Sequence, residues 1–166
     1  MPVAGHVGSD YERLRPDFRV IADPFDPSRR IMLVPAIRPD VSLIHALAAD
    51  GDGTLLLDPM EDDALLAQAS LTVVASTERI LSRDDLRRRG DGVILEGIHV
   101  TALVELAGGA HPTRVRGTYE ADAAHLAEYV AAAREDRSFK EYLARYVWEP
   151  DDHAAYLRAV GGTLPA

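Results

Sequence analysis

The sequence predicts an α/β protein with an open, mainly parallel sheet flanked by helices and a C-terminal helical lobe. Short apolar runs separated by turns and helical stretches fill residues 31–106, the pattern of buried strands alternating with helices. The last third of the chain changes to helical spacing, with apolar residues at i, i+3, i+4 and i+7: Leu126, Tyr129, Val130 and Ala133. With 166 residues, the chain has the size of one domain.

The domain organisation follows from where proline and glycine concentrate. Residues 1–30 are predicted to be an irregular connector that packs on the domain, because glycines and prolines interrupt them and Asp23–Pro27 indicates consecutive turns. Residues 31–166 are predicted to form a single α/β domain. Its helical C-terminal part is expected to cover residues 118–162.

Individual elements are predicted by apolar runs and capping residues. Asp58 followed by Pro59 predicts a helix over 59–69, and Ser82 opens a short polar helix that Gly90 ends. Ser138 and Glu141 have the spacing of a capping box, and a final helix is expected from Pro150 to Gly161-Gly162. The expected strands occupy residues 31–37, 41–46, 55–57, 71–75, 93–95 and 99–106.

Composition excludes several classes of function. A formal net charge of −9 argues against a nucleic-acid partner, because phosphate backbones bind surplus lysine and arginine. The chain has no cysteine, so it has no disulfide framework and no thiolate nucleophile or ligand. No apolar run approaches the roughly 20 residues of a membrane span. We therefore expect a soluble, cytoplasmic protein that does not enter a membrane.

The segment Gly108-Gly109-Ala110-His111 directly follows a predicted strand. Two glycines there let the backbone turn sharply and bring N–H groups close to a ligand, and His111 would stand at the carboxyl edge of the sheet. The segment is therefore a candidate substrate-binding loop. The alternative is a tight crossover in which His111 only caps a neighbouring helix.

His45 and Glu78 are the candidate catalytic residues. His45 lies within an apolar strand, where it is either a hydrogen-bonded core residue or a proton carrier oriented by Asp50. Glu78 follows another strand and is either a general base or the residue that caps the next helix. The remaining histidines lack the i, i+4 spacing of a helical metal pair, so no metal site is expected.

Several short sequence motifs, in order along nearly the whole chain, resemble those of the A-type subunits of the two-subunit coenzyme A transferases, in the glutaconate-transferase-like branch. The match rests on the sequence from Val34 to Asp40, on His45-Ala46 followed by Asp50, and on a glutamate after a strand at Glu78. The glycine loop and its neighbours complete it: Gly108-Gly109-Ala110-His111-Pro112 and Asp152-His153-Ala154-Ala155-Tyr156-Leu157.

The resemblance implies an α/β chain that works with a B-type subunit of a CoA-transferase and uses a coenzyme A thioester as substrate, with no bound cofactor. In this family the nucleophile is a glutamate of the B-type subunit, which attacks the acyl-CoA carbonyl and passes through a glutamyl-CoA thioester. No acid of this chain inherits that role. The family's glycine-rich N-terminal segment is missing, so the chain resembles the C-terminal half of an A-type subunit in a truncated, split or diverged stand-alone form.

Three functions are compatible with these residues. The first is a partial A-type subunit of a transferase, joined by the missing N-terminal half and by a B-type subunit, with Gly108–His111 lining the acyl pocket. The second is a hydrolase or lyase on the same scaffold that opens a ring-containing acyl-CoA, as related steroid-degrading proteins do. The third is a non-catalytic assembly module.

Overall fold

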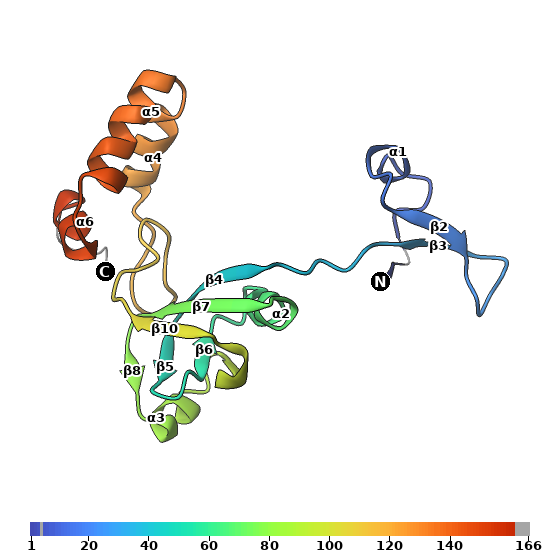
Figure 1. Cartoon of the computed structure of the whole chain (residues 1–166), viewed down its shortest axis with the longest axis horizontal. Coiled ribbons are helices and arrows are strands. Elements are labelled where there is room, and N and C mark those ends of the chain that lie inside the picture. The colour runs from blue at the N-terminus through green and yellow to red at the C-terminus, as the bar shows by residue number, and fades with distance from the viewer. Residues whose placement is uncertain (4, 162–166) are drawn as a thin grey trace. The chain divides into compact units, whose positions relative to one another are not determined.

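The chain forms two compact units, Met1–Arg38 and Pro39–Ala166. The computed structural model describes residues 1–3 and 5–161. The first unit is built on a small antiparallel sheet, whereas the second contains a parallel sheet, a mixed sheet and several helices (Figure 1).

The N-terminal unit is a three-stranded antiparallel sheet in the order β1-β3-β2. Residues 1–30 are predicted from the sequence to be an irregular connector, whereas in the structure this segment contains short strands and one helical turn. The expected turns are present, because Asp23 and Asp26 accept backbone N–H groups two residues further on. The elements are β1 (Pro2–Val3), α1 (Tyr11–Leu14), β2 (Arg19–Ala22) and β3 (Arg30–Leu33).

A parallel sheet in the order β10-β7-β4 forms the centre of the second unit. Its strands are β4 (Val41–Ala46), β7 (Thr72–Thr77) and β10 (Ala102–Glu105). The register pairs His45 with Ser76 and Ser76 with Val104, so all three strands end near one edge. The α/β class expected from the sequence is thereby confirmed.

A mixed four-stranded sheet in the order β8-β5-β6-β9 continues from the parallel one. The chain bends at Leu47, between β4 and β5, and passes from one sheet into the other. Asp50 shapes the following turn, because its Oδ1 accepts the N–H groups of Asp52 and Thr54 at 2.9 Å each. The strands are β5 (Ala48–Asp50), β6 (Leu55–Leu57), β8 (Ile80–Leu81) and β9 (Val93–Leu95).

The core follows the two-residue alternation of the strands. In β4 and β7, alternate residues face inward and are buried: Ser42, Ile44 and Ala46, and Val73, Ala75 and Thr77. β6 is buried at all three positions, so it is the fully enclosed strand expected from its Leu-Leu-Leu run. Helix α2 (Asp63–Ala69) covers this side with Ala67.

The remaining helices are short and have identifiable starts. Ser82 caps α3 by accepting the N–H of Asp85, Asp122 caps α4 through His125, and Asp152 caps α6 through Ala155. We use the name helical lobe for the helices and the π-helical turn within residues 123–159. The elements are α3 (Arg83–Arg88), the 3₁₀ turn η1 (Gly97–His99), α4 (Ala123–Ala132), α5 (Asp136–Leu143), η2 (Ala144–Trp148) and α6 (His153–Ala159).

The sequence-based expectations fail at some strand bounds and at helix starts. The strand expected over 31–37 ends at Leu33, the one expected over 99–106 covers only Ala102–Glu105, and β5 was not expected.

The predicted helix at 59 begins instead at Asp63, because Asp58 accepts the N–H of Met60 and makes a turn first. Ser138 does not cap a helix, since its hydroxyl donates to the carbonyls of Ala132 and Glu135. The last helix starts three residues after Pro150 and ends at Ala159, shortly before Gly161, whose φ of 106° fits the predicted stop. Gly162 lies outside the described residues.

Within residues 1–3 and 5–161, the structure contains no helix that is long and apolar enough to cross a membrane.

Gly92 lies against β6 so tightly that a methyl group has no space. A Cβ at Gly92 would stand 2.5 Å from the carbonyl oxygen of Leu57 and 2.9 Å from Cδ1 of Leu56. We expect Gly92→Ala to lower the free energy of unfolding by about 1–3 kcal/mol, as overpacking does. Gly51→Ala is the matched control, because a Cβ there meets nothing within 4 Å. Equal urea midpoints for the two variants would contradict this packing.

Candidate functional site

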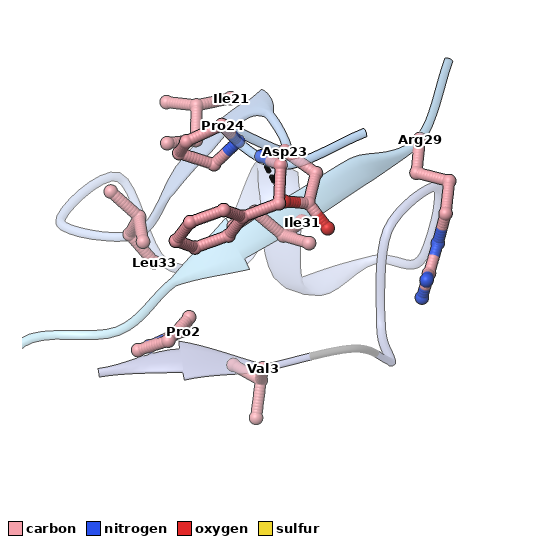
Figure 2. Close-up of a pocket in the computed structure, with 9 residues that line it drawn as sticks. Pro2, Val3, Ile21, Asp23, Pro24, Arg29, Ile31 and Leu33 are labelled. Atoms are coloured by element: carbon pink, nitrogen blue, oxygen red, sulfur yellow. Dashed lines mark hydrogen bonds between the residues drawn. The ribbon is translucent and has the colours of Figure 1, made fainter. Parts of the chain in front are cut away.

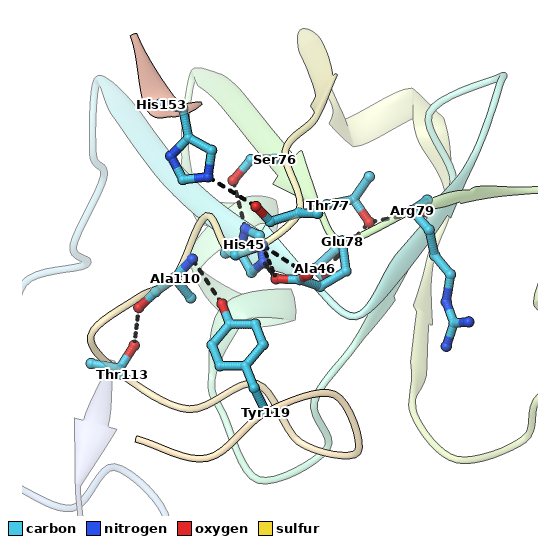
Figure 3. A network of polar contacts seen from close by, with 12 residues as sticks. His45, Ala46, Ser76, Thr77, Glu78, Arg79, Ala110, Thr113, Tyr119 and His153 are labelled. Carbon is cyan, nitrogen blue, oxygen red and sulfur yellow. Dashed lines mark hydrogen bonds and ion pairs between the residues drawn. The ribbon is translucent and has the colours of Figure 1, made fainter. Parts of the chain in front are cut away.

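A chain of hydrogen bonds joins Ser76, His45 and Glu78 where β4 and β7 end (Figure 3). His45 and Ser76 are register partners in adjacent strands, so their side chains leave the sheet on the same face. His45 Nδ1 lies 2.8 Å from Ser76 Oγ, and its Nε2 lies 2.7 Å from Glu78 Oε1. The parallel register therefore brings together the two predicted candidates and one serine.

Gly108 binds the other side of Glu78. Its N–H donates to both carboxylate oxygens of Glu78, at 2.9 and 3.1 Å. Gly108 has a φ of 74°, in the left-handed region where glycine carries no steric cost. The loop after β10 can therefore turn back towards the end of β7.

Gly109 packs directly against the ring of His45. A Cβ at Gly109 would lie 2.9 Å from His45 Cε1 and 2.8 Å from the carbonyl oxygen of Leu106. The two adjacent glycines thus do different things: Gly108 holds the carboxylate, and Gly109 leaves space for the imidazole.

His45 Nε2–H donates to the Glu78 carboxylate, whereas Nδ1 pairs with the Ser76 hydroxyl as donor or acceptor according to the tautomer. Glu78 is only 8% exposed, and both its oxygens already accept hydrogen bonds. Such a carboxylate orients a ring and a loop; it is poorly placed to attack a substrate carbonyl.

Tyr119 holds the Gly108–His111 loop through Ala110, and this role was not anticipated from the sequence. Its hydroxyl accepts the N–H of Ala110 at 3.2 Å, and the residue is 3% exposed. Burial, together with the nearby charge of Glu78, raises the pKa of Tyr119 well above its usual value, so the phenol stays protonated. A tyrosine nine residues beyond a loop has no sequence signature that links it to that loop.

His111, expected as part of the binding loop, turns its ring to the helical lobe. Its Nδ1 lies 2.6 Å from the hydroxyl of Tyr156, and its Nε2 lies 3.3 Å from Asp122 Oδ2. The His111 side chain is 2% exposed. The loop therefore presents the backbone of Gly108–Ala110 beside Glu78 and His45, while the His111 ring connects it to the lobe.

His125 adds a second histidine to this buried junction. Its Nε2 lies 2.8 Å from the hydroxyl of Tyr142, and its ring centroid is 5.3 Å from that of His111. Burial lowers the pKa of His125, and the neighbouring His111 lowers it further. The N–H of His125 in turn donates to Asp122, which lowers the pKa of that carboxyl together with His111.

Two hollows meet at His45. One, of about 350 Å³, is bordered by His45 and Ala110 and by a charged rim: Asp58, Glu61, Asp63, Arg114 and Arg116. The other, of about 290 Å³, lies over the parallel sheet and is mostly apolar, with Leu43, Val74 and Val104 among its lining residues. Both hollows have the size of small-ligand sites.

The charged rim of the larger hollow is more acidic than basic. Arg116 already pairs with Asp58 at 3.1 Å. Burial, followed by the nearby carboxylates of Glu61, Asp58 and Asp62, raises the pKa of Asp63. This rim disfavours a polyanion such as the phosphate groups of coenzyme A, so these groups need positive charge from elsewhere.

A third hollow, of about 400 Å³, lies in the N-terminal unit (Figure 2). It is bordered by Ile21, Ile31 and Leu33 and by Phe25, whose side chain is 97% exposed. Such a lining suits packing against another surface. Among the described residues, no three histidine or acidic side chains are grouped so that they could hold a metal ion.

Gly109→Ala tests the fit between the glycine loop and His45. The added methyl group must displace the imidazole or the loop, so we expect a loss of about 1–3 kcal/mol in unfolding free energy. The His45 ring signals, assigned in NMR spectra with His45→Gln, should shift. Gly51→Ala should leave both quantities unchanged, and unshifted ring signals in Gly109→Ala would contradict the contact.

The lowered pKa of His125 predicts that acid destabilises the fold of the helical lobe. Its pKa is lowered in the folded protein, so the unfolded chain binds the proton more readily below about pH 6.5. The free energy of unfolding should therefore decrease as pH falls below that value, and His125→Gln should flatten the slope. His99→Gln, at an exposed histidine, should not. The charged neighbours are His111, Asp122, Glu128 and Arg145.

No protein-family model matches the chain. The chain is 31% identical over 147 residues to the A-type subunit of glutaconate CoA-transferase from Acidaminococcus fermentans, covering 88% of this chain and 46% of that protein. It is 29% identical to the A-type subunit of 3-oxoadipate CoA-transferase from Pseudomonas knackmussii, covering 91% and 53%. The chain thus spans about half the length of these relatives.

A hydrolase and a crystal structure also match. The IpdA subunit of a cholesterol ring-cleaving hydrolase from Rhodococcus jostii is 27% identical, with 95% of this chain and 57% of that protein covered. The crystal structure of glutaconate coenzyme A-transferase from Acidaminococcus fermentans superimposes with a TM-score of 0.87 at 28% identity, covering 97% of this chain and 56% of that chain. In sequence and fold, the chain is related to about half of a glutaconate-transferase-like A-type subunit of the coenzyme A transferases.

Proposed function

We propose that the chain is part of an A-type subunit in a cytoplasmic coenzyme A transferase, which moves coenzyme A from an acyl-CoA to a carboxylic acid. The observation that carries the proposal is the likeness to glutaconate CoA-transferase in both sequence and fold. In this proposal, a partner of the B type supplies the nucleophilic glutamate. The occupied oxygens of Glu78 support that division of labour.

The reaction would proceed through successive acyl-transfer steps on the partner's glutamate. The carboxylate attacks the thioester carbonyl, releasing coenzyme A thiolate and forming a mixed anhydride. The thiolate then attacks the glutamyl carbonyl, which gives the glutamyl-CoA thioester and frees the first acid. The acceptor carboxylate repeats the two steps in reverse, so glutamate is regenerated and no redox cofactor is consumed.

The Gly108–His111 loop would line the acyl pocket in this assembly. Glu78 and His45 would act as positioning residues, because they hold the loop and touch no reacting atom in the proposed reaction. The backbone N–H groups of the loop already donate to Glu78, Leu106, Tyr119 and Gly108, so the loop would give the pocket its shape and not hydrogen-bond donors. Ala110 also borders the larger hollow, which is the space open to a substrate on this side of His45.

A hydrolase is the second candidate, and one feature favours it. The order Ser76–His45–Glu78 resembles the arrangement that activates a hydroxyl group, and a ring-cleaving hydrolase is among the relatives. Such an enzyme would open a ring-containing acyl-CoA with water alone. Product analysis without an acceptor acid separates the two functions, because only the hydrolase then forms product.

The transferase proposal is tested on the complex that purifies with a tagged form of this chain from its own cells. We expect transfer of coenzyme A between acids by the complex and none by the isolated chain. Borohydride reduction during turnover should label a glutamate of the partner. Label on Glu78, or transfer by the chain alone, would contradict the proposal.

Glu78→Gln separates positioning from nucleophilic attack. The amide cannot accept from Gly108 and His45 as the carboxylate does, and a charge-assisted hydrogen bond is worth about 1.5–3 kcal/mol. We therefore expect kcat of the complex to fall about 10- to 100-fold while the borohydride label on the partner remains. Glu149→Gln, at an exposed glutamate directly after η2, is the control. Complete loss of the label in Glu78→Gln would contradict a positioning role.

A further inference from the structure

Helix α6 contacts the Gly108–His111 loop at both of its ends, and we call these two contacts the α6 clamp. His153 Nε2 lies 2.9 Å from the carbonyl oxygen of Ala107, the residue directly before the loop. A carbonyl oxygen only accepts, so the Nε2–H of His153 is the donor. At the other end, the hydroxyl of Tyr156 lies 2.6 Å from His111 Nδ1. Figure 3 shows His153 beside the hydrogen-bond network of the site.

Both contacts come from one side of α6. The carboxylate of Asp152 accepts the N–H of Ala155, so His153 is the first residue of the helix. His153 and Tyr156 are three residues apart, a spacing that places two side chains on the same side of a helix. Their ring centroids are 6.0 Å apart and the ring planes differ by 27°. None of the residues of α6, all of which the structure describes, is buried, so polar contacts contribute much of what holds this helix against the loop.

The middle of the loop contacts the site. The N–H of Gly108 donates to both carboxylate oxygens of Glu78, and a Cβ at Gly109 would lie 2.9 Å from His45 Cε1. Because Gly108 directly follows Ala107, a displacement of Ala107 changes the hydrogen bonds to Glu78. The position of α6 is thereby connected to the imidazole and the carboxylate through only a few residues of backbone.

We propose that Tyr156 and His153 are positioning residues of the acyl pocket, which hold the Gly108–His111 loop from both ends and so set the orientation of the His45 ring. The inference rests on the proposed function, because that function makes the loop a wall of the pocket. Ala110 borders the larger hollow, so the position of the loop also sets the width of that hollow. Neither residue touches a reacting atom in the proposed reaction.

A purely structural role inside the helical lobe is the alternative, and the lobe contains a matched control for it. The hydroxyl of Tyr142 lies 2.8 Å from His125 Nε2. Tyr142→Phe and Tyr156→Phe each remove one hydroxyl from a tyrosine–histidine pair. Only the pair of Tyr156 includes a residue of the loop.

Amide hydrogen exchange, measured by NMR on the full chain, tests the clamp without any substrate. The loss of one neutral hydrogen bond should accelerate local opening about 2- to 10-fold. We expect the N–H of Gly108 to exchange faster by this factor in Tyr156→Phe, relative to the amides of β7, and to be unchanged in Tyr142→Phe. Equal exchange of Gly108 in the two variants would overturn the clamp.

His153 provides a test by rescue. His153→Ala removes the donor to Ala107 and should accelerate exchange of Gly108 about 2- to 10-fold. His153→Gln should restore the exchange of the parent, because the glutamine amide can donate to the same carbonyl oxygen. An alanine variant with the exchange rate of the parent, or a glutamine variant no better than alanine, would overturn the role of His153.

Kinetics of the complex that purifies with the tagged chain test the consequence for catalysis, with butyryl-CoA or glutaconyl-CoA as donor and acetate as acceptor. We expect Tyr156→Phe to lower kcat about 2- to 10-fold with little change in KM, and Tyr142→Phe to leave both unchanged. In a Glu78→Gln background the effect of Tyr156→Phe should shrink, since both substitutions act through one loop. Fully additive losses would overturn this route. A parent complex that transfers no coenzyme A would count against the proposed function alone, and the exchange of Gly108 would still decide the clamp.

Discussion

The Glu78 carboxylate is the group on which the candidate site depends. It is carried by the residue after β7, it binds the ring of a β4 residue, His45, and it accepts the N–H of Gly108 beyond β10. A buried carboxylate is stable only when such donors surround it. One side chain therefore fixes the relative positions of three strand ends, the orientation of an imidazole and the course of the glycine loop.

The sequence predicted the strands better than the contacts between them. The runs at 41–46, 55–57 and 93–95 are confirmed as β4, β6 and β9, because apolar alternation is a local property. Helix starts such as Asp63 could not be predicted, since the competing turn at Asp58 also depends on the distant Arg116. The pairing of His45 with Ser76 depends on register between residues 31 positions apart, which the sequence does not encode locally.

In the proposed function, the chain is one part of a larger catalytic assembly. It contributes a sheet edge, a loop held by hydrogen bonds and two hollows, whereas the acidic rim of the larger hollow is unsuited to the phosphates of coenzyme A. In the proposed assembly, a partner contributes the reactive glutamate, and basic side chains for the phosphates come from outside this rim. That division accounts for a net charge of −9 in a protein proposed to handle a polyanionic substrate.

His45 also serves as a partition. Its imidazole borders both the charged hollow and the apolar one. On the loop side, Gly109 packs so closely against the ring that no space remains between them. A ligand that displaces the ring from one hollow would change the shape of the other hollow and strain the hydrogen bonds of His45 to Ser76 and Glu78. Binding in one hollow would therefore change the space available in the other through the position of this one ring.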